Sequence, residues 1–172
     1  MIISHGRNSY RCSPNLAHPI SEWTIPSYSS SYVSCSGDTF HLRGAGGWHE
    51  IAWWAFDVEK PGSYEFSYDY DIPYFKFWSS PGTAWNHFGL YIASNNPHGL
   101  DGDSMQYYFE KSQNRMGSDI ISNTNQAYNL TGHKTSTLTL STGRYWLWFP
   151  GAIADDYIDL TFTFTNIVVK LI

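Results

Sequence analysis

Tryptophan residues are the side chains of this chain best suited to hold a ligand by direct contact. In residues 144–149, Trp146 and Trp148 occupy alternate positions. Because successive side chains of a strand point to opposite faces, these two indoles share one face, opposite Tyr145, Leu147 and Phe149. Trp53, in an earlier strand-like run, points away from its apolar neighbours in the same way. Flat aromatic faces stack on the C–H faces of sugar rings, so we predict a glycan site built from Trp146, Trp148 and Trp53, with Trp78 or Trp85 on a nearby loop.

Two other interpretations of these tryptophans stay open. A sandwich this rich in aromatic residues buries most of them in its core. Aromatic residues are also enriched in contacts between protein chains, so the same side chains could form a subunit interface.

Acidic residues suggest two further kinds of chemistry. Glu65, Asp69 and Asp71 alternate along one strand, and same-face neighbours lie roughly 6.6 Å apart, which overlaps the spacing of glycosidase carboxylates. A solvated strand face gives the same pattern, so we do not assign a catalytic pair. Carboxylates in turns are also ligands for a structural Ca²⁺, and the candidates are Asp155, Asp156 and Asp159, with Asp101 and Asp103 as a second cluster.

The elements that must position these side chains are strands. In residues 63–72, Tyr64, Phe66 and Tyr68 alternate with polar residues, which is typical of a strand with one buried face. Similar patterns occur at 39–43, 51–58, 87–93, 104–110, 136–140, 144–149 and 157–172, and no segment shows a helical period. We predict an all-β fold, an antiparallel β-sandwich of eight or nine strands with jelly-roll topology. The predicted core is Tyr64, Phe66, Tyr68, Phe88, Leu90, Ile92, Tyr145, Leu147 and Phe162.

Length and composition support one folded domain. The 172 residues suffice for a core, and we expect an irregular N-terminal arm over 1–30 followed by a single sandwich over 31–172. The net charge of -5 and the absence of a basic cluster disfavour nucleic-acid binding, and no apolar run is long enough for a membrane span. The first residues do not resemble a signal peptide, so we expect Cys12 and Cys35 to remain unbridged thiols.

Several short motifs resemble one family. The order of Pro14-Asn15-Leu16, Trp23-Thr24, Phe40-x-Leu42-x-Gly44 and the step 61–68 is similar to the jelly-roll carbohydrate-binding modules of families 4 and 9. The closing segments 143–149 and 159–167 also resemble the last two strands of that family. The resemblance is closest to versions of the module in phage tail and minor structural proteins. It implies a jelly roll, and it adds support for the Ca²⁺.

The function expected from these features is not enzymatic. We expect a virion structural or adhesion protein that decorates a capsid or belongs to a tail or baseplate, made in the host cytoplasm and assembled into the particle. Its expected partners are other virion proteins or further copies of itself, and cell-surface glycan, but neither nucleic acid nor membrane. The alternatives are a carbohydrate-binding module of a secreted glycoside hydrolase and, third, a jelly-roll glycosidase or lyase.

Overall fold

The structure, a computed structural model, describes residues 13–25, 33–44, 47–76, 89–96, 115–120, 126–153 and 158–172. Within these ranges the chain forms one short 3-10 helix and a series of strands. They are η1 (Ile20–Glu22), β1 (Val33–Ser36), β2 (Thr39–Gly44), β3 (Gly47–Val58), β4 (Gly62–Lys76), β5 (Tyr91–Ala93), β6 (Arg115–Met116), β7 (Gln126–Leu140), β8 (Gly143–Ile153) and β9 (Ile158–Leu171).

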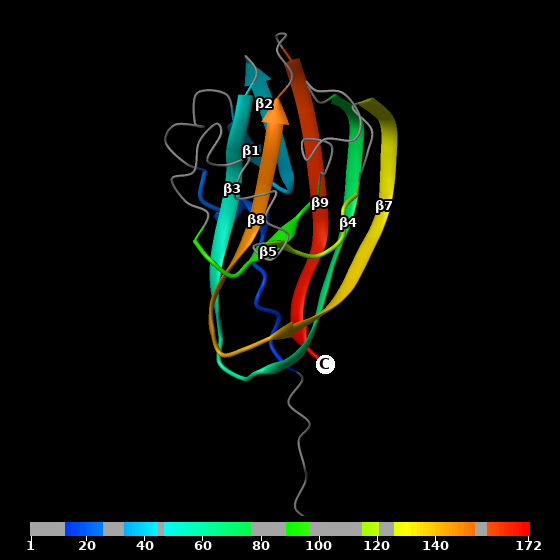
Figure 1. The fold of residues 1–172 in the computed structure, drawn as a ribbon. Coiled ribbons are helices and arrows are strands. Elements are labelled where there is room, and N and C mark those ends of the chain that lie inside the picture. Colours follow the sequence, from blue (N-terminus) through cyan, green and yellow to red (C-terminus); the bar gives the residue numbers. More distant parts are fainter. Residues whose placement is uncertain are drawn as a thin grey trace, which may run out of the picture.

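Two antiparallel sheets form the molecule and pack face to face (Figure 1). The five-stranded sheet has the order β1-β2-β9-β4-β7, and the four-stranded sheet has the order β3-β8-β5-β6. The predicted all-β antiparallel sandwich is therefore confirmed. The predicted strand at 104–110 lies outside the described residues, and jelly-roll topology stays a prediction.

The core follows the alternation that the sequence shows. Of the nine predicted core residues, seven are buried: Tyr64, Phe66, Tyr68, Leu90, Ile92, Leu147 and Phe162. Tyr145 is only partly buried, and Phe88 lies outside the described residues. The side chain of Phe149 on β8 joins the two sheets, because its ring lies 5.1–5.4 Å from those of Phe40, Phe162 and Phe164 on the other sheet.

A hydrogen bond also crosses the core. The backbone N–H of Leu90 donates to the Tyr68 hydroxyl at 3.2 Å. Gly89 leaves room for this contact, since a Cβ there would lie 3.1 Å from the same hydroxyl oxygen. Burial raises the pKa of Tyr68, so the phenol stays neutral and keeps its hydrogen at any ordinary pH.

The segment 13–25 closes one side of the sandwich by bonding to both sheets. Asn15 accepts a hydrogen bond from the Val169 N–H at 2.7 Å and donates to the Ile167 carbonyl at 2.8 Å. Farther along, Thr24 and Trp53 exchange two backbone hydrogen bonds at the edge of β3. Ile20 and Trp23 between them are buried in the core. This part of the predicted arm is thus an integral piece of the fold, while the boundary at residue 30 stays a prediction.

Two further expectations from the sequence concern thiols and membranes. Cys35 is a free thiol, and Cys12 lies outside the described residues. The described part of the chain contains no helix with the length and apolar character that a membrane crossing requires.

Candidate functional site

The outer face of the four-stranded sheet brings together the three tryptophans predicted to form a platform. Trp53 on β3 stands directly opposite Trp148 on β8, and Ala55 stands opposite Trp146. Residues opposite each other in an antiparallel pair point to the same side, so Trp53, Trp146 and Trp148 share one face. The predicted grouping is therefore present, with Trp53 and Trp146 as diagonal neighbours.

Trp148 corrects the prediction of an exposed platform. Its side chain has no accessible surface, so it cannot stack on a sugar. Tyr91 of β5 stands opposite it in the register, is equally buried, and places its ring centroid 6.5 Å from that of Trp148. Alternation along a strand determines which side of the sheet a residue occupies, but not whether that side is open to solvent. Trp148 is therefore a buried residue of this face and not a stacking residue.

Trp146 has the environment expected of a stacking residue. It is partly exposed and stands between Ala55 on β3 and Ala93 on β5. The two alanines end at Cβ, so no long side chain at either opposing position competes for the space beside the indole. Trp53 is partly exposed as well. The two indoles form an aromatic surface on which a flat ligand can rest.

An ion pair borders this surface on one side. Arg144 and Asp57 occupy opposite positions on β8 and β3, and their closest side-chain atoms, Nη1 and Oδ2, are 3.9 Å apart. Both side chains are well exposed, at 60% and 66%. Such a loose pair contributes little to stability, but its guanidinium can donate to ligand hydroxyls and its carboxylate can accept from them.

A more buried polar cluster borders the other side. Arg115 Nη1 donates to Asp119 Oδ1 at 2.7 Å, and the Tyr91 hydroxyl donates to the same oxygen at 2.5 Å. The guanidinium carbon of Arg115 also lies 5.2 Å from the centre of the Tyr91 ring. Burial, together with the nearby Asp119 charge, raises the pKa of Tyr91. The hydroxyl therefore remains a donor that fixes the segment 115–120 beside the aromatic surface.

Sequence reasoning missed the polar half of this site. Asp57, Tyr91 and Arg144 lie on three strands that are distant in sequence from one another, and a fourth distant segment contributes Arg115 and Asp119. Only the strand register shows that they surround Trp146. The sequence did contain a signal for Arg144 and Asp57. Arg144 lies two residues before Trp146, and Asp57 lies two residues after Ala55, which stands opposite Trp146.

No protein-family model, curated protein or solved structure matches this chain. The resemblance to carbohydrate-binding modules therefore rests on the sequence motifs alone. The geometry of this chain's own side chains has to carry any functional conclusion.

Several predicted site residues are not brought into this surface by the described part of the chain. Trp78 and Trp85 lie outside the described residues, as do Asp101, Asp103, Asp155 and Asp156. Asp159 belongs to β9, where its backbone pairs with that of Arg43. Within the described residues there is no group of three or more His, Cys, Asp and Glu side chains that could hold a metal ion. The calcium site stays a prediction.

The acidic strand face on the five-stranded sheet has a structural explanation. Asp69 accepts hydrogen bonds at 2.6 Å from both Asn166 Nδ2 and His133 Nδ1, and so links β4 to its two neighbours, β9 and β7. The Asn166 hydrogen bond, and then that of His133, lower the pKa of Asp69. Glycosidases need one carboxylic acid with a raised pKa, so this shift is opposite to the one a general acid requires.

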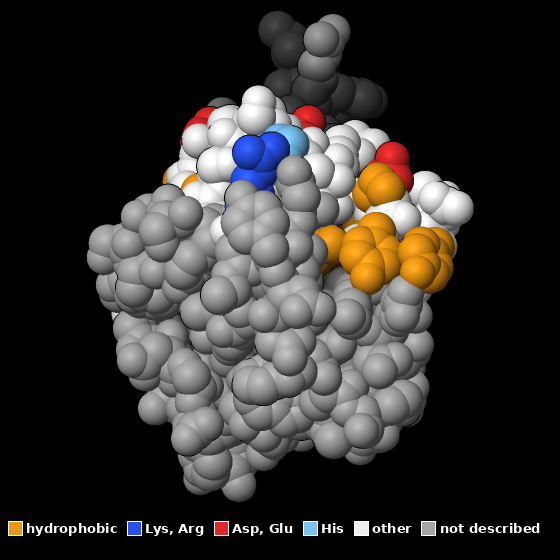
Figure 2. All heavy atoms as spheres, turned by 90° about the horizontal axis from the view of Figure 1, so that it is seen from above, with side chains coloured by type: hydrophobic (Ala, Val, Ile, Leu, Met, Phe, Trp, Pro, Cys, Tyr) orange, Lys and Arg blue, Asp and Glu red, His pale blue; other side chains and the backbone are white. Residues whose placement is uncertain are grey.

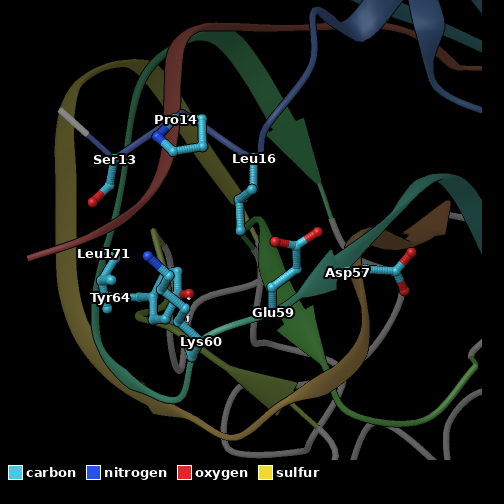
Figure 3. A pocket seen from close by; sticks show the side chains of 8 residues that line it. All are labelled: Ser13, Pro14, Leu16, Asp57, Glu59, Lys60, Tyr64 and Leu171. Carbon is cyan, nitrogen blue, oxygen red and sulfur yellow. Dashed lines mark hydrogen bonds between the residues drawn. The ribbon is translucent and has the colours of Figure 1, made fainter. Parts of the chain in front are cut away.

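A pocket of about 360 Å³ lies where the segment 13–16 passes over the turn between β3 and β4 (Figure 3). Leu16 and Glu59 point toward each other across it, whereas the Asp57 carboxylate points away. The Tyr64 hydroxyl donates to the Lys60 carbonyl at 2.8 Å, and burial followed by the Glu59 charge raises the pKa of Tyr64. The pocket therefore lies between the N-terminal segment and the sandwich.

Proposed function

We propose that the chain is a non-enzymatic adhesion and structural module of a virus particle, with jelly-roll topology and a sugar-binding surface on its four-stranded sheet. The observation that carries the proposal is the position of Trp146. This indole is partly exposed, has alanine on both sides, and lies between two sets of paired Arg and Asp side chains.

The chemistry of this surface suits a neutral glycan. The indole face contacts the apolar face of a pyranose ring, while Asp57 and Arg144 offer an acceptor and a donor for hydroxyl groups at its rim. Each of the two arginines has an aspartate partner within 4.0 Å, so these groups add no net charge that would attract a polyanion. Binding is expected to change little with salt.

A glycan array tests the adhesion part of the proposal. We expect the wild-type chain to bind a defined set of neutral glycans and Trp146→Ala to lose at least tenfold in affinity for them. Ile172→Ala is the control, because Ile172 is 66% exposed but follows β9 of the other sheet. Melting temperatures of all three proteins should agree within a few degrees. Unchanged binding by Trp146→Ala, or no binding by the wild type, would contradict the surface we propose.

The structural part of the proposal rests on the phage-like motifs and includes association with virion proteins or with further copies of the chain. Genes adjacent to its own distinguish it from the alternative of a module in a secreted enzyme. Virion genes are expected there, and glycoside hydrolase genes would favour the alternative.

A further inference from the structure

Strand β7 is a long edge strand. It has 15 residues and stands at the end of the five-stranded sheet, where β4 is its only partner among the described strands. Figure 1 shows it along the outside of the sheet, beyond β4. The alternate residues from Thr131 to Thr139 are exposed, so their side of the strand is open to solvent.

Among the described strands, the other sheet edges are short or protected. β1 and β6 end their sheets with only four and two residues. The edge of β3 is bonded to Thr24 of the N-terminal segment. Proteins commonly shorten or cover edge strands because the unpaired N–H and C=O groups there pair with other chains. β7 departs from this rule, since it is long, contains no proline and has Lys134 as its one charged residue.

We propose that β7 pairs antiparallel with β7 of a second copy about a two-fold axis, which joins two five-stranded sheets into one continuous sheet. The proposal specifies the surface for the self-association included in the proposed function, and its role in a particle rests on that function. A two-fold axis requires only one self-complementary surface, and an edge strand is the simplest such surface.

The side chains of β7 favour one register. Full-length pairing places His133 on the two-fold axis. Two residues that face each other then lie equally far from His133 in sequence, one before it and the other after it. Tyr128 faces Leu138, Thr131 faces Thr135, and Lys134 faces Gly132. Aromatic–aliphatic and Thr–Thr cross-strand pairs stabilise sheets, and no lysine faces a lysine.

Tyr128 supplies a reason for this partner to be a second copy. It is one of only two large hydrophobic residues in the described ranges that are strongly exposed, at 62%. Tyr74 lies beside it, with the ring centroids 5.2 Å apart. Figure 2 looks down on the end of the sandwich where β7 begins and shows hydrophobic side chains gathered there. The proposed register brings the second copy's apolar residue 138 onto this cluster.

Sedimentation equilibrium on the purified chain tests the proposal. We expect a monomer–dimer equilibrium, and we expect Thr131→Lys with Thr135→Lys to weaken dimerisation at least tenfold, because each new lysine then faces another across the axis. Ser34→Lys with Thr161→Lys is the control, since it adds the same charge to the same outer face, on β1 and β9. A wild-type chain that stays monomeric, or a dimer that both variants leave unchanged, would overturn the proposal.

Disulfide trapping provides a second test that tolerates a folding defect in the lysine variant. With Cys12 and Cys35 replaced by serine, His133→Cys should form a covalent dimer on mild oxidation, because directly opposed positions are close enough to bridge. Thr161→Cys in the same background should stay monomeric. Failure of His133→Cys to cross-link would refute the register. Neither test involves a sugar, so a negative result here is distinct from a failure of glycan binding.

Discussion

Trp146 and Trp148 lie two positions apart on one strand and point to the same side of the sheet, yet their surroundings differ. Trp148 faces Trp53 and Tyr91 on its two neighbouring strands, whereas Trp146 faces two alanines. The two tryptophans therefore differ both in the size of their cross-strand neighbours and in their burial. The predicted face is right for both, while the predicted exposure is wrong for Trp148.

Replacing each tryptophan should give different stability effects. We expect Trp148→Ala to lower the free energy of unfolding by about 3–5 kcal/mol, since it leaves a cavity in a fully packed site. Trp146→Ala should cost clearly less. Urea unfolding followed by circular dichroism measures both values. Equal losses of unfolding free energy would contradict the distinction between a buried and a partly exposed tryptophan.

Asp69 predicts a pH dependence of stability. Its folded-state pKa is lowered by Asn166 and His133, so the carboxylate stabilises the fold above the unfolded pKa, and this contribution disappears as the pH falls through the folded pKa. The melting temperature of Asp69→Asn should therefore lie below that of the wild type at pH 7, and the two should converge between about pH 5 and pH 2. Asp71→Asn removes a carboxylate from the same strand face and serves as the control. A constant gap at all pH values would contradict the assignment.

At the scale of elements, the N-terminal segment behaves as part of the sandwich. Asn15 bonds to the backbone of β9 through both its side-chain oxygen and its nitrogen, and Thr24 bonds to β3. Short irregular segments such as this one show no period in the sequence. We call the contacts of Asn15 with β9 and of Thr24 with β3 the Asn15 clasp, because together they connect the two sheets. Local sequence pattern could not predict these contacts, because their partners lie more than 25 residues away.

A single substitution tests this clasp. Asn15→Ala should lower the free energy of unfolding by about 1–3 kcal/mol, because it removes the hydrogen bonds that satisfy the Val169 N–H and the Ile167 carbonyl. Ser13→Ala, two residues earlier, is the matched control and should have a smaller effect. Chemical denaturation gives both values, and an equal effect of the two variants would show that the Asn15 contacts are dispensable.

At the scale of the whole molecule, the sequence predicts the fold class better than the site. Alternation in β4, β8 and β9 is regular enough to predict both the strands and their buried faces. It could not predict the first ten residues of β7, where polar residues occupy both faces of an edge strand, or the neighbours of Trp146. Those neighbours depend on strand order and register, which involve contacts between distant segments.

Amide hydrogen exchange can detect association along β7. At low concentration, amides on the free edge of β7 should exchange much faster than those of β9, which has a strand on each side. At high concentration the same β7 amides should slow by at least tenfold if a second copy covers them. Exchange along β7 that is independent of concentration would argue against the dimer.

The position of β9 also constrains when this protein can fold. The last of the described strands, β9, lies at the centre of the five-stranded sheet, between β2 and β4. While a ribosome is still making residues 158–171, the hairpin of β1 and β2 has no contact with the pair of β4 and β7 through this sheet. The Asn15 clasp likewise waits for Val169, 154 residues later. Non-local pairing of this kind is slow, so the nascent chain exposes two sheet fragments until β9 has been made. Folding of the five-stranded sheet is therefore expected to wait until β9 has left the ribosome.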